Sequence, residues 1–218
     1  MGTKGALVRL KWFLMMIVFI VIGLSDSVYL TYHHYQVNIL KPAKKSFCSI
    51  SQTIDCDKAA SSVGATLLEV PVATWGMFAF IFLLFFILVE RLLYWEVQKA
   101  LYCFIFVVIY GMAAFSAYEA ILSFFVLKVV CLMCLFLYII MTFMVISCKH
   151  ALNVTHHELV LLLYDLFFRS FSRTLLRKGI SVSIIALVFS GVIAFGLDHQ
   201  FKSHFSYMRV DMLFFNPE

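Results

Sequence analysis

The stretch VVCLMCLF, residues 129–136, places Cys131 and Cys134 at the head of a long apolar run. Residues three apart lie about one turn apart on an α-helix. At a helix N-terminus, unpaired backbone N–H groups and the helix dipole favour the thiolate, which is the reactive form of cysteine. The stretch therefore predicts a redox-active pair at the start of a membrane-spanning helix.

The composition of the whole chain is typical of a polytopic membrane protein. Of its 218 residues, 63% are hydrophobic and only 13% are charged, which is too apolar for a soluble domain. The 24 Phe and 10 Tyr suit helices that face lipid. The net charge of +5 bears on topology before it bears on partners, and we expect no nucleic-acid partner.

Hydropathy divides the chain into five predicted membrane spans. A helix needs about 20 apolar residues to cross a bilayer. The spans are expected over about residues 12–32, 72–93, 100–122, 127–147 and 179–197. The predicted fold class is an all-α membrane protein, with four transmembrane helices within residues 1–149 and a fifth transmembrane helix and an outer tail within residues 179–218.

The polar segment 33–70, between the first two spans, is predicted to be an outer redox loop. It contains Cys48 and Cys56. Residues 57–68 are expected to form a short amphipathic helix, because an aspartate suits the start of a helix, although Gly64 weakens its middle. The loop thus contains a second cysteine pair that could exchange disulfides with Cys131 and Cys134.

The last third of the chain has a less specific pattern. Residues 150–178 are predicted to be a cytoplasmic connector, in which residues 156–171 form an amphipathic helix on the membrane surface. The tail, residues 198–218, shows no clear pattern.

Lysine and arginine set the predicted orientation. With the N-terminus inside, ten of the 17 basic residues fall on inner segments and seven on outer ones, which is the sign of the positive-inside rule. Loop 33–70 and the head of the fourth span then lie outside, where disulfides persist. We therefore expect a cytoplasmic N-terminus and both cysteine pairs on the outer face. The fifth span and the tail favour a bacterial inner membrane, in which the cysteine pairs would be periplasmic.

The four paired cysteines suggest a path for electrons. Cys131 lies near the outer surface, within reach of the loop, whereas Cys134 lies one turn deeper, where a lipid-soluble acceptor has access. Electrons would pass from an outside thiol to Cys48 and Cys56, then to Cys131, and from Cys134 to a hydrophobic acceptor. Each step but the last is the attack of a thiolate on a disulfide.

Two other interpretations of the cysteines stay open. Buried cysteine is a common small apolar residue, so the pair could be core packing. The second alternative is a zinc site formed by the four cysteines. Zinc-ligand pairs usually lie two to four residues apart in the sequence, and Cys48 and Cys56 are farther apart than that, so no metal is expected. Cys103 and Cys148 lie within or at the end of apolar runs and are expected to be inert.

Three ionisable residues near the outer end of the first span are expected to be solvated. They are Asp26, His33 and His34. An acid within an apolar run indicates function by default, but Asp26 lies near the end of its span, so an interfacial carboxylate is favoured over a proton relay.

The order of motifs resembles the vitamin K epoxide reductase family over about residues 10–150. The matching features are GLSDSVYLTYH (23–33), Cys48-x7-Cys56, Asp57-Lys-x-x-Ser-Ser62, Pro71-x4-Gly76 and Cys131-x-x-Cys134. By that resemblance the protein is a four-helix bundle around a quinone, with Cys131 and Cys134 as its active-site disulfide. Cys134 would react with the quinone, Cys56 would exchange with Cys131, and Cys48 would face the thiol partner.

The resemblance also implies two quinone-binding residues. Ser62, six residues after Cys56, matches a family serine near the quinone head group, and Tyr138, one turn after Cys134, matches a family tyrosine that lines the site. The alternatives are a helix-surface hydroxyl for Ser62 and a core or interface aromatic for Tyr138.

The resemblance implies a quinone-dependent thiol–disulfide oxidoreductase similar to DsbB, although the order of the two cysteine pairs is the reverse. Many bacterial members carry a fused thioredoxin-like domain, and this chain shows none, so we expect a separate DsbA-like thioredoxin-fold protein on the outer face as its partner. The acceptor would be ubiquinone or menaquinone. The alternatives are a vitamin K epoxide or quinone reductase of the endoplasmic reticulum and a non-enzymatic membrane scaffold with a structural loop disulfide.

Overall fold

A computed structural model of the chain describes residues 3–41, 45–92, 95–152 and 173–215. Long helices dominate it: α1 (Thr3–Tyr35), α3 (Val72–Leu92), α4 (Trp95–Ile121), α5 (Leu132–Leu152) and α7 (Arg173–Phe215). In the described part of the chain, five helices are long and apolar enough to cross a membrane. The expected all-α membrane fold is confirmed.

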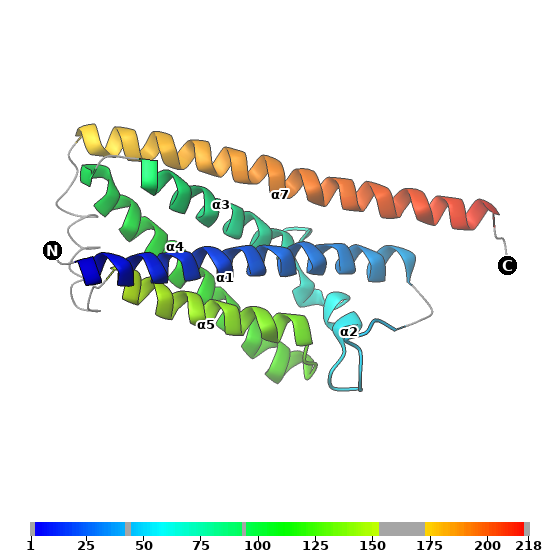
Figure 1. The fold of residues 1–218 in the computed structure, drawn as a ribbon. Helices are drawn as coiled ribbons and strands as arrows, with labels where there is room; N and C mark the ends of the chain where they lie inside the picture. The colour runs from blue at the N-terminus through cyan, green and yellow to red at the C-terminus, as the bar shows by residue number, and fades with distance from the viewer. Residues whose placement is uncertain (1–2, 42–44, 93–94, 153–172, 216–218) are drawn as a thin grey trace.

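The first four long helices pack together and the last lies against them (Figure 1). Helix α1 packs on α5 and α3, while α4 packs on the same two helices. Helix α7 runs along α3.

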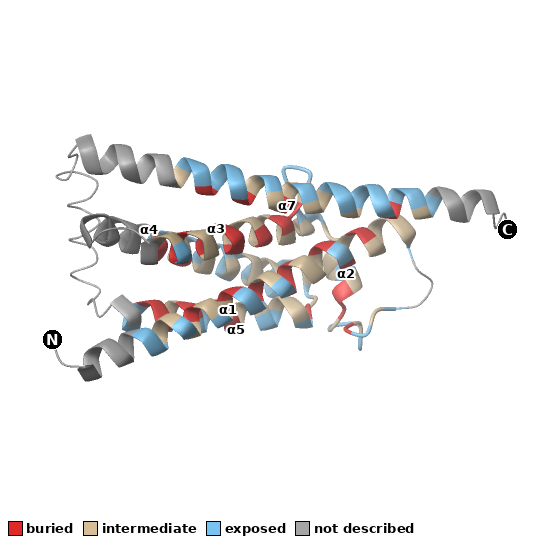
Figure 2. Cartoon of the chain, turned by 45° about the horizontal axis from the view of Figure 1, so that its top comes forward, coloured by how far each residue is buried: buried red, intermediate tan, exposed pale blue. Residues whose placement is uncertain are grey.

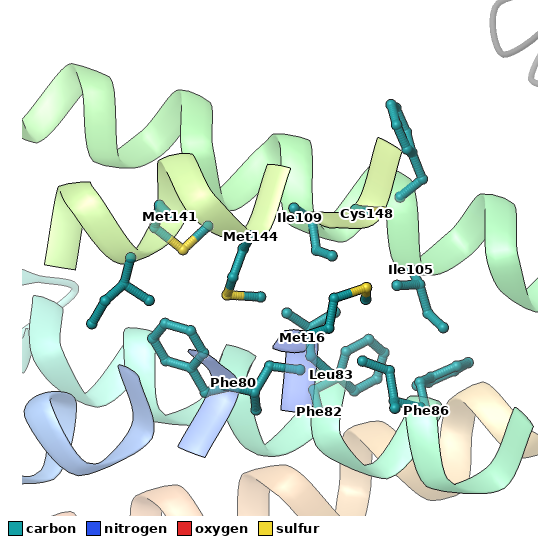
Figure 3. Packing of buried hydrophobic residues seen from close by; sticks show 14 of the residues in the cluster. Met16, Phe80, Phe82, Leu83, Phe86, Ile105, Ile109, Met141, Met144 and Cys148 are labelled. Atoms are coloured by element: carbon teal, nitrogen blue, oxygen red, sulfur yellow. The ribbon is translucent and has the colours of Figure 1, made fainter. Parts of the chain in front are cut away.

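The core of the bundle consists of apolar side chains from α1, α3, α4 and α5 (Figure 3). Phe80, Leu83 and Phe86 of α3 meet Ile109 of α4 and Met144 of α5, and all five are at most 1% exposed. Because lipid is as apolar as these side chains, the helices are held by van der Waals packing rather than by exclusion of water.

One glycine permits the close contact of α1 and α3. A Cβ atom on Gly23 would lie 2.5 Å from the ring carbon Cζ of Phe80, a separation that real Cβ atoms essentially never show. Small residues let membrane helices approach closely. Gly23 therefore sets the distance between these two helices.

Figure 2 shows exposed residues along the outer faces of the helices, and many of these residues are large and apolar. Val18 of α1, Phe143 of α5 and Val188 of α7 are 54%, 47% and 61% exposed. A helix that is apolar all round suits a lipid environment. This surface supports the conclusion that the protein is integral to a membrane.

The segment between α1 and α3 is more structured than expected. A π-helix (Gln36–Leu40) extends α1, and three short elements precede α3: helix α2 (Cys56–Ala60), a 3-10 turn (Val63–Ala65), and a hairpin of β1 (Thr66–Leu67) and β2 (Val70–Pro71). The predicted single helix over residues 57–68 is therefore wrong beyond Ala60.

Local chemistry explains where this segment changes conformation. The Asp55 side chain caps α2 by accepting from the backbone N–H groups of Asp57 and Lys58. Leu68 and Glu69 have φ angles of 54° and 65°, which form the hairpin turn and exclude a continuous right-handed helix.

The C-terminal tail is also more ordered than its sequence indicated. Helix α7 continues to Phe215, so the described part of the tail, residues 198–215, is helical. Asp198 anchors it, accepting hydrogen bonds from the Tyr35 hydroxyl at 3.0 Å and the Thr74 hydroxyl at 2.8 Å. The tail sequence shows no clear hydrophobic pattern, so neither this helix nor the tertiary contacts of Asp198 could be predicted from it. The predicted surface helix at residues 156–171 lies outside the described residues.

Candidate redox site

The two cysteine pairs meet at one end of the bundle. Cys48 and Cys56 form a disulfide with a Cα–Cα distance of 5.7 Å, whereas Cys131 and Cys134 are free thiols. Cys48, Cys56 and Cys131 belong to one buried cluster, against which Cys134 also packs. The structure thus brings together all four cysteines that the sequence singled out.

Two backbone hydrogen bonds hold the loop against the start of α5. The N–H of Val130 donates to the carbonyl of Thr53 at 2.7 Å, and the N–H of Asp55 donates to the carbonyl of Val130 at 3.1 Å. Ile54 and Val130 therefore pair as a short parallel bridge. Because Cys56 follows one side of this bridge and Cys131 the other, the bridge keeps the two cysteines adjacent.

Cys131 sits immediately before the first residue of α5. Its Sγ accepts a hydrogen bond from the backbone N–H of Cys134 at 3.2 Å, and its carbonyl accepts from Leu135 at 3.0 Å. The Cys134 thiol, together with the N–H groups of Cys134 and Met133, holds the pKa of the Cys131 thiol below its usual value against the opposing effect of burial. The expected thiolate-favouring helix start is present.

A buried aspartate organises the loop around the disulfide. Asp55 caps α2, and its Oδ1 accepts a hydrogen bond from the Ser49 hydroxyl at 2.8 Å. The Lys45 ammonium lies 3.9 Å from its Oδ2. Burial alone would raise the pKa of Asp55, but the hydrogen bonds from Lys58 and Ser49 hold it below the usual range. Asp55 is thus a stable anion next to Cys56.

A second aspartate ties the loop to α1. The Asp57 Oδ1 lies 3.0 Å from Nε2 of His33, and its Oδ2 accepts from the N–H of Ser46 at 3.1 Å. Burial would raise the pKa of Asp57, but hydrogen bonds from Ser46 and Ser49 and the nearby His33 lower it. His33 is only 2% exposed. Its predicted solvation is wrong, because the folded loop covers it.

A cavity of about 360 Å³ lies beside the cysteines, between the loop and helices α1, α3, α4 and α5. This is the size of a pocket for a small molecule. Its lining is largely apolar and includes Cys56, Cys131 and Cys134. An apolar ligand in this space would therefore contact the α5 pair directly.

Both predicted quinone-binding residues line this cavity. Ser62 borders it from the loop, and its hydroxyl donates to the carbonyl of Ala59 at 2.8 Å. Tyr138 borders it from α5, one turn beyond Cys134. Their positions agree with the expected roles, which stay predictions because the structure contains no ligand.

Several residues that border the cavity were not expected there. Glu119 of α4 and Ser27 of α1 contribute polar groups, and His34, expected to be solvated, is partly buried at the rim. Trp75 lines it too and donates from Nε1 to the carbonyl of Leu67 at 3.2 Å. Like Asp26, Glu119 is an acidic residue within an apolar run of the sequence, and this feature could have identified it as a candidate site residue.

Asp26 itself is buried rather than solvated. It is 7% exposed, and its Oδ2 has no hydrogen-bond partner. The expectation of an interfacial carboxylate is wrong because α1 continues in helical conformation to Leu40, which places Asp26 well inside the helix.

Cys48 and Cys148 are both buried, although Cys48 lies in a loop. Cys48 is 0% exposed, so an outside thiol reaches it only after the loop moves. Cys148 is 1% exposed within the apolar core of the bundle, far along α5 from the pair. The side chain of Cys103 lies outside the described residues.

Comparison with known proteins supports the sequence resemblance. The chain matches the model of the vitamin K epoxide reductase family over residues 14–148. A search of curated proteins gives no match. The matched region spans well over half of the chain and contains about two thirds of α1, all of α3 and α4, nearly all of α5 and both cysteine pairs. The chain therefore belongs to the vitamin K epoxide reductase family, whose members are membrane oxidoreductases that act between thiols and quinones.

Proposed function

We propose that this protein reoxidises a separate DsbA-like thioredoxin-fold protein and passes the electrons to a membrane quinone, thereby supporting disulfide-bond formation. One observation supports this relay most strongly. Cys56 and Cys131 pack in the same buried cluster, and both line the apolar cavity that Cys134 also borders. The loop disulfide and a lipid-soluble acceptor would thus both have access to the α5 pair.

The proposed sequence of exchanges begins at the loop. A partner thiolate attacks Cys48 and releases Cys56 as a thiolate. Cys56 then attacks Cys131 of an oxidised α5 pair, which frees the Cys134 thiol, and Cys48 regains its bond to Cys56 when the partner leaves oxidised. After this exchange the loop pair is a disulfide again and the α5 pair consists of two thiols, which can then reduce the quinone.

The last exchange moves two electrons and two protons. Cys131 and Cys134 form a disulfide, and the quinone becomes a quinol. Ser62 and Tyr138 are proposed to border the quinone ring, because both line the cavity. The acceptor would be ubiquinone or menaquinone. The proposed setting is a bacterial inner membrane, with the N-terminus in the cytoplasm and the cysteine pairs in the periplasm.

The test is quinone reduction by the purified protein in detergent, driven by a reduced thioredoxin-fold partner. Each of the four paired cysteines is replaced in turn by alanine. The proposal expects every replacement to stop sustained turnover, since each thiol takes part in the relay. Full activity of Cys134→Ala protein would refute it.

A second function, a non-enzymatic scaffold with a structural disulfide, has one observation in its favour. Both sulfurs of the loop disulfide are buried, with Cys48 and Cys56 at 0% and 1% exposed. Trapping distinguishes the two functions. With the loop disulfide intact, a reduced partner that lacks its second cysteine should attack Cys48, release Cys56 as a thiol and stay bonded to Cys48 if the protein is an enzyme, whereas a scaffold should form no such adduct.

A further inference from the structure

The proposed reaction requires a group that moves protons inside the cavity. Two thiols release two protons as they become a disulfide, and a quinone takes up two as it becomes a quinol. The cavity lining is mainly apolar, so water is a poor carrier there. A titratable side chain that borders both Cys134 and the ligand space would do this work.

Among the residues that line the cavity, Glu119 has the right position. It lies on α4, which packs against α5, and it borders the same space as Cys134 and Tyr138. Its charge acts on both the Cys134 thiol and the Tyr138 hydroxyl. Its carboxylate makes no hydrogen bond or ion pair with any described residue, so its oxygens are available to a ligand.

The other titratable groups nearby fit less well. Asp26 acts on the Cys134 thiol but does not border the cavity. His34 borders it, but its ring contacts Asn38 at 3.3 Å, at the far end of α1. Tyr138 borders it too, yet a phenol with an ordinary pKa of about 10 exchanges protons at neutral pH less readily than a carboxyl.

We infer that Glu119 is a catalytic residue that carries protons from the thiols of the α5 pair to the quinone. This inference rests on the proposed function. The Glu119 carboxylate takes the proton of the Cys134 thiol and gives it to one quinone oxygen. It then takes the proton of the Cys131 thiol and gives it to the other oxygen, as the bond between Cys131 and Cys134 forms. Two electrons and two protons leave the thiols and reach the quinone, and Glu119 ends ionised as it began.

The direct test isolates the quinone step in a single turnover. Full-length protein is reduced with dithiothreitol, freed of the reductant and mixed with a short-chain ubiquinone in detergent, and the loss of quinone absorbance is followed. We expect Glu119→Gln to slow this step about 100-fold, the usual effect of losing a proton-transferring group. Glu119→Asp should recover part of the rate, because it restores a carboxyl.

Two matched variants and a second readout separate a catalytic role from a structural one. Glu69→Gln, which changes an exposed residue of the hairpin turn, should keep the wild-type rate. Asp26→Asn, which removes a charge that acts on Cys134 from outside the cavity, should slow the step much less than Glu119→Gln does. Glu119→Gln should also exchange disulfides with a reduced thioredoxin-fold partner at the wild-type rate, which shows that it is folded. Its quinone step should show a changed solvent deuterium isotope effect.

Different results would overturn different claims. A wild-type rate of quinone reduction in Glu119→Gln protein would refute the role of Glu119 while the proposed function stands. An equal loss in Asp26→Asn protein would also refute it, because that residue does not border the cavity. Failure of the wild-type protein to reduce quinone would instead overturn the proposed function itself.

Discussion

The two ends of the four-helix bundle are held together by different forces. At one end, apolar side chains from all four helices interlock, as Leu83, Phe86 and Met144 show (Figure 3). At the other end, a disulfide, a two-strand bridge and buried carboxylates hold a loop over a cavity. The packed end fixes the helices, and the polar end leaves room for a ligand and for thiols to change partners.

The contrast explains why similar residues behave differently at each end. Cys148 and Cys134 lie on the same helix, but one is enclosed by core side chains and the other borders a cavity. A thiol buried in a packed core is inert because no reactant can reach it, whereas a thiol that borders a cavity can react with a ligand bound there. The following predictions use such pairs, from the largest expected effect to the smallest.

Replacing a thiol at each end should separate chemistry from packing. Cys134→Ala should reduce quinone turnover on the order of 10³-fold or more, because groups that act as a unit fail together. Cys148→Ala removes a buried sulfur from the core and should cost only about 1 kcal/mol of stability while turnover is kept. Steady-state quinone reduction and thermal unfolding in detergent measure the two effects. Equal activity of the two variants would contradict the contrast.

A methyl group added between α1 and α3 should destabilise the bundle. Gly23→Ala places a Cβ against the Phe80 ring, and such overpacking costs about 1–3 kcal/mol, while the gain in helix propensity returns at most about 1 kcal/mol. We therefore expect a net loss of up to about 2 kcal/mol in thermal unfolding experiments.

The matched control for this change is Gly196→Ala on α7, where no atom beyond the helix's own neighbouring backbone lies within 4 Å of the added Cβ. This control should be neutral or slightly stabilising. Equal unfolding temperatures for Gly23→Ala and the wild type would show that α1 and α3 separate easily, contrary to the packing described.

Removing the helix cap at the redox end should loosen the loop but leave the bundle intact. Asp55→Ala loses the cap of α2 and the hydrogen bond from Ser49, which together are worth about 1–2 kcal/mol. Amide hydrogen exchange of residues 53–60 should accelerate, while exchange in α3 should not change. Asp55→Asn keeps a capping oxygen and should show a smaller effect. Acceleration throughout the bundle would mean that the two ends are not independent.

Acid should weaken the contact between the loop and α1 by a small amount. The pKa of Asp57 is lowered in the folded protein, so its contribution is present above the ordinary aspartate pKa of about 4 and is lost as pH falls through the folded value. Protection of the loop amides should therefore drop below about pH 4. Asp57→Asn protein should show a shallower pH dependence, and an unchanged profile would contradict the role of this ion pair.

Hydrophobicity predicted the spans because a bilayer requires long apolar helices whatever their neighbours are. The meeting of the two cysteine pairs was also predictable, since cysteine spacing and position carry a chemical meaning. The burial of His33 was not, because it depends on a loop that folds back over α1. The helical tail depended likewise on Asp198, whose partners Tyr35 and Thr74 lie far away in the sequence.

The central claim is that the α5 pair alone reduces the quinone and that the loop pair only supplies it with electrons. The most direct test is a single turnover with protein in which Cys48 and Cys56 are both replaced by serine. After reduction with dithiothreitol and removal of the reductant, this variant should reduce one short-chain ubiquinone per protein molecule, yet a reduced thioredoxin-fold partner should not sustain further turnover. The account would be contradicted if this variant reduced no quinone, or if protein lacking both Cys131 and Cys134 still did.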